Sequence, residues 1–296
     1  MVIKYQINIR NYSKACLHKL KGLLKKTMMK YLLTILSILL FPFVNNVCAQ
    51  ESTELSAKEL AMKLNNPVSS LISLPFQNST DVGIGEFNGT RNTLNIQPVV
   101  PAGLTKNINL ITRVILPIIS QQNISESGQS ESGLGDAIVS MFLNPAVSKN
   151  GFTWGAGPVF LVPTSTNDLL ATKKFGIGPT AVALYQSGGS TIGGLINQIW
   201  SVAGNENTSD VNQLYFQPFY GYNWESGAGI GADMEIIHSW ESGKTTAWLV
   251  PTVSAVSSIG NQMVQFIIGP RINLVAPENA KAKFGVRAQL VFLFPR

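Results

Sequence analysis

The sequence predicts an all-β fold, a transmembrane antiparallel β-barrel of about 12 strands preceded by a short N-terminal periplasmic helix. Three observations predict it: strict alternation of apolar and polar residues near the C-terminus, few charged residues without a long apolar run, and an N-terminal export signal. Such a chain is exported and then presents one face of each strand to lipid and the other to a lumen.

The C-terminal segment alternates with a period of two, which is the period of a β-strand. One face carries seven apolar residues: Ala282, Phe284, Val286, Ala288, Leu290, Phe292 and Phe294. The other face carries Lys283, Gly285, Arg287 and Gln289, joined near the end by Val291 and Leu293. In an exported chain of low charge, we expect the aromatic face to point outward to lipid and the charged face to point into the lumen.

Residues 1–49 are predicted to be a signal peptide. They contain a positive stretch, a short apolar stretch and a small-x-small cleavage pattern, formed by Lys25 to Lys30, residues 31–44 and Val47-Cys48-Ala49. Cleavage would leave Gln50 as the N-terminus, and Met28 or Met29 would start a leader of ordinary length. A lipid anchor on Cys48 is the weaker alternative, because asparagines precede it where small or apolar residues are wanted.

Charge is sparse after the leader. Eight of the 22 Lys and Arg residues and none of the 16 Asp and Glu residues lie in residues 1–49, so the remainder carries 14 basic against 16 acidic residues. This balance offers no basic face, and we exclude nucleic acid as a partner. No apolar run after the leader approaches the ~18 residues of a membrane helix. Low charge without such a run is typical of a barrel.

The exported chain divides into a helix with a linker, residues 50–68, and a barrel, residues 69–296. The helix is predicted over residues 51–66, with Ser56 and Glu59 forming a capping box. A helix of roughly ten residues spans only ~15 Å. We therefore expect it to dock at the periplasmic mouth of the barrel, and a plug inside the lumen is the alternative.

Twelve strand-like segments separated by turn residues follow the helix. They lie at approximately residues 69–79, 93–101, 108–122, 136–146, 152–163, 175–187, 191–203, 212–224, 227–240, 245–257, 262–275 and 281–294. Long and short loops alternate, and the predicted long loops are residues 80–92, 123–135, 164–174 and 204–211. Bacterial barrels keep both termini and their short turns in the periplasm, so we expect the long loops on the outside.

Five tryptophans near strand ends are predicted to form girdles at the membrane interfaces: Trp154, Trp200, Trp224, Trp240 and Trp248. Burial in the core of a soluble β-sandwich is the alternative, which the export signal and the low charge disfavour. In the segment 245–257 the facing is ambiguous, because Trp248 and Leu249 are adjacent and both favour burial.

An outward aromatic face assigns six charged residues to the lumen: Arg113, Asp233, Glu235, Arg271, Lys283 and Arg287. An arginine or lysine facing lipid near mid-membrane would cost about 2–4 kcal/mol. Arg271, Lys283 and Arg287 lie on the last two strands and form a basic strip. In one interpretation this strip binds or conducts anionic solutes. In the other, which we favour, it pairs with Asp233 and Glu235, because unpaired charges in a narrow lumen are costly.

The exported part of the sequence predicts no catalytic, cofactor-binding or metal site. His238 is its one histidine and it has no cysteine, so no cluster of metal ligands forms. A barrel hydrolase like the outer-membrane phospholipase would place a histidine and a serine on the lipid face. His238 shares the outward face with Trp240, but the next strand has Trp248 where the serine would be expected. We interpret His238 as an interfacial residue.

Several segments resemble a bacterial outer-membrane family: NPVSSLISLPFQN (residues 66–78), LNIQPVVP (94–101), LITRVILPII (110–119), GLGD (133–136) and LVFLFPR (290–296). The family comprises outer-membrane barrels related to the phenol-degradation meta-pathway proteins, often labelled "transporter" or "neuromedin U". The resemblance covers residues 60–296 and implies an outer-membrane β-barrel with a transport role and no catalytic residues. Many such barrels end on an aromatic residue, whereas here Pro295 and Arg296 follow Phe294.

We therefore expect a non-enzymatic barrel in the outer membrane of a Gram-negative cell. It would pass a small solute passively, through the polar lumen or by a lateral route suited to hydrophobic or aromatic compounds. Its expected partners are outer-membrane lipid and the barrel-assembly machinery, with no cofactor. Two other classes stay open: a non-conducting structural or adhesive barrel, and a membrane-embedded hydrolase that depends on His238.

Overall fold

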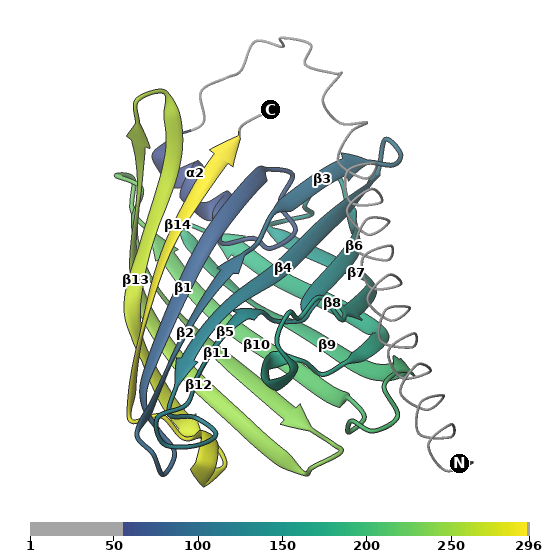
Figure 1. Cartoon of the computed structure of the whole chain (residues 1–296). Helices are drawn as coiled ribbons and strands as arrows, with labels where there is room; N and C mark the ends of the chain where they lie inside the picture. The colour runs from purple at the N-terminus through teal and green to yellow at the C-terminus, as the bar shows by residue number, and fades with distance from the viewer. Residues whose placement is uncertain (1–55, 295–296) are drawn as a thin grey trace, which may run out of the picture. The chain divides into compact units, whose positions relative to one another are not determined.

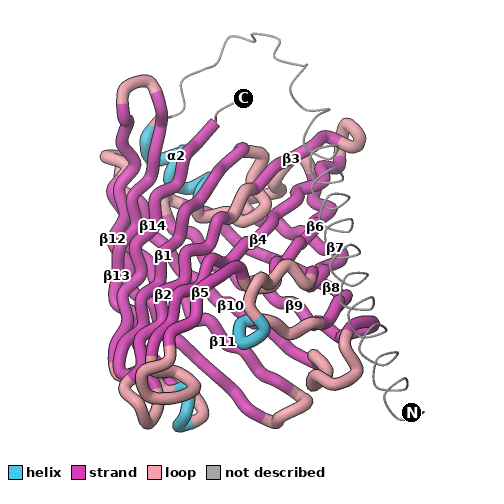
Figure 2. Tube along the Cα trace, viewed as in Figure 1, coloured by secondary structure: helices cyan, strands magenta, loops and turns pink. Residues whose placement is uncertain are grey.

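The structure is a computed structural model and describes residues 56–294 (Figure 1). These residues form the short helix α2, Ala57–Leu64, and fourteen strand segments (Figure 2). The strands are β1 (Ile72–Ile84), β2 (Gly89–Ile96), β3 (Val99–Gly103), β4 (Ile108–Gln122), β5 (Ser130–Leu134), β6 (Ala137–Pro145), β7 (Phe152–Val162), β8 (Lys174–Ser187), β9 (Ser190–Gly204), β10 (Asn212–Asn223), β11 (Ala228–Ser239), β12 (Lys244–Ile259), β13 (Gln262–Val275) and β14 (Phe284–Phe294). Two 3-10 turns, η2 (Asp168–Leu170) and η3 (Glu278–Ala280), lie in loops.

The strands form one closed antiparallel sheet. Consecutive strands pair with each other, except β2 with β3 and β5 with β6, and β1 pairs with β14 along its length, which closes the barrel. β2 and β3 pair with successive parts of β4, and so do β5 and β6, so each of these two pairs fills one strand position. The barrel therefore has 12 strand positions, and the predicted fold class is confirmed.

The last strand shows which way the two faces point. Phe284 is 50% exposed and Phe294 is 42% exposed, whereas Arg287 is 4% exposed. The aromatic face is thus outside and the charged face inside, as predicted. Ala282 is the exception: it precedes β14 and is buried among Ile84 and other apolar residues, because the alternation begins only where the strand does.

The two ends of the barrel differ. The helix α2 and the last residue of β14 lie at one end, which we call the helix end (Figure 1). The turns at the helix end are residues 104–107, 146–151, 188–189, 224–227 and 260–261, and those at the opposite, loop end are residues 85–88, 123–129, 163–173, 205–211, 240–243 and 276–283. Longer connections gather at the loop end, in line with the predicted alternation.

Two of the predicted long loops are wrong in their bounds. Residues 80–92 are mostly strand, since β1 runs to Ile84 and β2 begins at Gly89, and β5 lies within the predicted loop 123–135. The outward side chains here are polar, which imitates the composition of a loop. Asn78 and Asn92 hydrogen-bond each other across β1 and β2 at 3.0 Å, so the polar groups satisfy one another on the strand surface.

Four of the five tryptophans fit the predicted girdles. Trp154 and Trp224 are exposed near the helix end, and Trp200 and Trp240 are exposed near the loop end. Trp248 was predicted wrongly: it is 8% exposed and points into the barrel. Its ring is held inside by a cation, because the guanidinium carbon of Arg271 lies 4.2 Å from the ring centroid.

Among the described residues the helix runs from Ala57 to Leu64, so it ends two residues before its predicted end. Ser56 and Glu59 form the predicted capping box, and the hydrogen bonds that Glu59 accepts from the backbone and hydroxyl of Ser56 lower the pKa of its carboxyl group. Leu60 and Ala61 are buried against Val256 of β12. Residues 51–55 of the predicted helix lie outside the described residues.

The predicted signal peptide, residues 1–49, also lies outside the described residues. Among residues 56–294, no helix has the length and apolar character needed to cross a bilayer.

Candidate functional site in the barrel lumen

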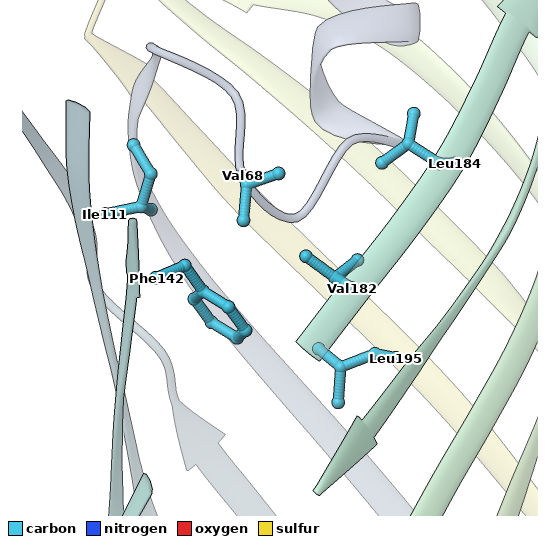
Figure 3. Close-up of a cluster of buried hydrophobic side chains, with 6 residues drawn as sticks. All are labelled: Val68, Ile111, Phe142, Val182, Leu184 and Leu195. Carbon is cyan, nitrogen blue, oxygen red and sulfur yellow. The ribbon is translucent and has the colours of Figure 1, made fainter. Parts of the chain in front are cut away.

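The interior has an apolar side, built by inward residues of β4, β6, β8 and β9. Six buried residues form this apolar cluster: Val68, Ile111, Phe142, Val182, Leu184 and Leu195 (Figure 3). Val68 belongs to the segment that follows α2, and Figure 3 shows it reaching inward toward the strand side chains. The amide of Asn144 donates to the Val68 carbonyl oxygen at 3.1 Å, which anchors this segment to β6.

The opposite side of the interior is charged. Arg271 of β13 pairs with Asp81 of β1 at 2.5 Å and with Glu235 of β11 at 3.2 Å. Arg287 of β14 pairs with the same Glu235 at 2.7 Å and with Asp233 at 3.2 Å. We call these five residues the ion-pair cluster. Arg271 and Arg287 of the predicted basic strip are therefore paired with acids in the way we favoured from the sequence, whereas Lys283 of that strip is not.

Local sequence explains how these groups fit into the wall. Asp233 and Glu235 are two residues apart on β11 and so share its inward face, as do Ser79 and Asp81 on β1. Gly285 lies opposite Asp81 on β14, and a Cβ atom there would overlap the Asp81 carboxylate. A glycine at this position leaves the space that the Arg271–Asp81 pair occupies.

The cluster continues toward the loop end as an apolar layer. Trp248 stacks on Arg271 and packs with Ile84, Val250 and Ala282. On the neighbouring wall, Arg91 donates to Gln121 at 2.8 Å, and Gln121 donates to Glu131 at 2.9 Å. These contacts place side chains in the lumen between the ion pairs and the loop end.

Two of the six predicted lumen residues lie apart from the cluster. Arg113 of β4 donates to the side-chain oxygen of Gln97 at 2.7 Å and forms no ion pair with a carboxylate of residues 56–294. Lys283 precedes β14 at the loop end, where it is exposed and donates to Asn88 at 2.6 Å. The structure thus brings together Asp233, Glu235, Arg271 and Arg287.

Asp81 is the cluster member that sequence reasoning missed. The first predicted strand ended at residue 79, so Asp81 was assigned to a loop. Had the alternation of Gln77, Ser79 and Asp81 been followed, it would have placed this carboxylate on the inward face.

A cavity of about 220 Å³ lies inside the barrel, and we call it the lumen cavity. Residues 64–67 and Ser69, which follow or end α2, border it on one side, and Asp233 and Arg287 of the ion-pair cluster border it on another. The remaining wall combines apolar residues with six amide and guanidinium side chains: Gln77, Gln97, Arg113, Gln217, Gln265 and Gln289. Such a wall offers both hydrogen-bond donors and acceptors to a small guest.

Comparison with solved structures shows which known proteins have a similar fold. The crystal structure of the COG4313 outer membrane channel from Pseudomonas putida F1 matches with a TM-score of 0.59 at 16% identity, over 76% of this chain and 94% of that chain. The chain has the fold of an outer-membrane β-barrel. The outer membrane phospholipase A from Escherichia coli matches more distantly, with a TM-score of 0.42 at 13% identity, over 81% of this chain and 99% of that one. No family model and no curated protein matches the sequence.

The environment of His238 in this barrel fits an interfacial residue. Its ring makes an edge contact with Trp240 at 4.3 Å between centroids, and its Nδ1 atom lies 2.9 Å from the hydroxyl of Thr245. Thr245 is its cross-strand partner on β12, and Trp248, three positions further along that strand, points inward.

Proposed function

We propose that this protein is a passive channel or transporter for a small solute in the outer membrane of a Gram-negative bacterium. The observation that carries the proposal is the lumen cavity, which lies inside a closed barrel and is bordered by amide, guanidinium and carboxylate groups as well as by apolar residues. The likeness to an outer membrane channel supports the same class. The exposed aromatic face and the tryptophans near both ends support insertion in a bilayer.

The route through the lumen is narrow. The apolar cluster fills one side, the ion-pair cluster fills the other, and the segment after α2 lies across the helix end. A solute would therefore bind in the lumen cavity and leave when this segment moves, rather than pass along a wide water-filled pore. The resemblance to phenol-degradation barrels supports an aromatic or hydrophobic solute, for which a lateral route to the membrane is an additional path.

Single-channel recording in a planar bilayer tests this proposal. We expect a steady, low conductance with weak ion selectivity, because both arginines of the ion-pair cluster are paired with carboxylates. The protein would be taken from the outer membrane in detergent, and its folded state checked by heat-dependent migration on a gel. If a folded barrel shows no conductance and also gives no solute-driven swelling of liposomes, the proposal is contradicted.

A structural or adhesive barrel is the second candidate, and the filled lumen favours it. Such a barrel would show no conductance in the bilayer. Its loops would bind a partner outside the cell, so replacing loop-end residues 123–129 and 163–173 would abolish that binding. For a non-enzymatic protein, lipid hydrolysis by the purified barrel is expected to be absent, and activity that disappears in His238→Ala would instead establish a hydrolase.

A further inference from the structure

One arginine that borders the lumen cavity, Arg113, forms no ion pair within residues 56–294. Arg271 and Arg287 are each paired with two acids, whereas Arg113 donates only to the neutral side chain of Gln97 among residues 56–294. Arg113 borders the cavity, so its remaining guanidinium donors can reach a guest there. An unpaired guanidinium in a low-dielectric interior is costly, and an anion is the guest that would relieve it.

A second group in the same wall also lacks a partner. Gln265 of β13 is 1% exposed, and its Nε2 atom is buried without a hydrogen-bond acceptor in the described part of the chain. Buried amide donors are normally satisfied. Gln265 also borders the lumen cavity, so an acceptor atom on a guest could accept a hydrogen bond from its Nε2 atom.

The other walls limit the size and charge of that guest. Asp233 borders the same cavity and would repel a second negative charge, which favours a monoanion over a dianion such as phosphate. Phe219 and Val99 border the cavity beside the apolar cluster and would contact a non-polar body. At about 220 Å³, the cavity is smaller than the ~300 Å³ at which pockets for drug-sized ligands begin.

We propose that the lumen cavity is a binding site for small organic monocarboxylates, with Arg113 as the residue that holds the carboxylate. This proposal gives the proposed transporter a class of solute, and the biological role of the site rests on the proposed transport function. Gln97 positions the Arg113 guanidinium. The glutamine side chains of the wall hydrogen-bond the other polar atoms of the guest, and Phe219 and Val99 contact its non-polar part.

Isothermal titration calorimetry on the detergent-extracted barrel tests the site with matched acids and amides. The probes are acetate, butyrate and benzoate, each compared with its neutral amide of nearly the same shape. We expect at least one acid to bind about tenfold tighter than its amide, since a hydrogen bond to a charged group contributes roughly this factor. Equal affinity of acid and amide, or no binding of any acid, would overturn the proposal.

Gln97→Glu provides the variant that keeps the fold. It is nearly isosteric and places a carboxylate 2.7 Å from the Arg113 guanidinium, so it neutralises the cation without emptying space. We expect it to weaken acid binding about tenfold or more, and Arg113→Gln to do the same. Arg91→Gln is the matched control, because Arg91 is also an inward arginine bonded to a glutamine but does not border the cavity.

Unchanged acid binding in Gln97→Glu, or an equal loss in Arg91→Gln, would overturn the assignment to Arg113. Binding at equilibrium is measured without any opening of the channel. A barrel that conducts but binds no acid would therefore refute this site and leave the transport proposal standing, whereas a silent barrel that binds acids would do the reverse.

Discussion

Glu235 joins the two arginines on the charged side of the lumen. One of its carboxylate oxygens accepts from Arg271 at 3.2 Å and the other accepts from Arg287 at 2.7 Å. Each arginine has one further acid, Asp81 or Asp233. The cluster thus has two cations and three anions in contact, and Glu235 is the member shared by both cations.

Replacing this shared acid should be strongly destabilising. In Glu235→Gln, two buried guanidinium groups lose a charged partner, and removing one member of a buried ion pair costs about 3–5 kcal/mol. The free energy of unfolding, measured by urea titration of the barrel in lipid vesicles, would report the loss. Glu225→Gln is the control: Glu225 is 83% exposed in its pair with Lys58, and no measurable loss is expected there. Equal stability of both variants would contradict a structural role for the cluster.

Individual residues show what the sequence could and could not predict. The inward position of Arg287, Asp233 and Glu235 follows from alternation within single strands, and it was predicted. Whether Arg113 forms an ion pair depends on which strands face β4 across the lumen, and within residues 56–294 it forms none. Alternation within β4 does not predict how far Arg113 lies from a carboxylate on those strands.

At the scale of elements, one carboxylate adds to the backbone hydrogen bonds that hold the loop of residues 205–211 to the barrel. Asp210 accepts from the Lys174 ammonium at 2.7 Å and from the Ser201 hydroxyl at 3.1 Å. These hydrogen bonds, chiefly that of Lys174, lower the pKa of Asp210 below its ordinary value of 3.8. A lowered pKa means that the attachment is fully present above the ordinary value and is lost as the pH falls through the lowered one.

We therefore expect this loop to loosen only in strong acid. A spin label on Asn207→Cys would stay immobile from neutral pH down to about pH 4 and gain mobility below it. Asp210→Asn should abolish the pH dependence, whereas Glu206→Gln should keep it, since Glu206 forms no ion pair within residues 56–294. A transition that persists in Asp210→Asn would show that another group controls the loop.

Strand bounds were predictable where outward and inward residues differ in polarity. In β11 and β14, apolar residues face out and charged residues face in, and the predicted segments match these strands closely. In β1 and β2 most outward residues near the loop end are polar like the inward ones, so apolar and polar residues do not alternate and the composition predicts a loop. The continuation of β1 depends on pairing with β14, which joins the two ends of the chain.

For the whole molecule, the lumen is filled by three contributions that come from different parts of the chain. The apolar cluster and the ion-pair cluster line opposite walls, and α2 with the segment after it lies at the helix end. The strands are joined all round, so they form a rigid frame. Within residues 56–294 the helix has no backbone ladder with the strands. Hydrogen bonds from strand side chains attach it, such as Gln186 to the Met62 carbonyl oxygen at 2.7 Å and the Asn65–Asn223 bond of 2.7 Å, so it is the part that can move without opening the sheet.

Displacing this helix should widen the path through the barrel. Ala61 is 0% exposed, and Ala61→Asp would bury an unpaired carboxylate against Val256, so the helix should leave its seat. We expect single-channel conductance to rise several-fold while the strands stay folded. Lys63→Asp adds the same carboxylate at a partly exposed position of α2 and should leave conductance unchanged. If a folded Ala61→Asp barrel conducts like the parent, the ion pairs and the apolar cluster, rather than α2, limit passage through the lumen.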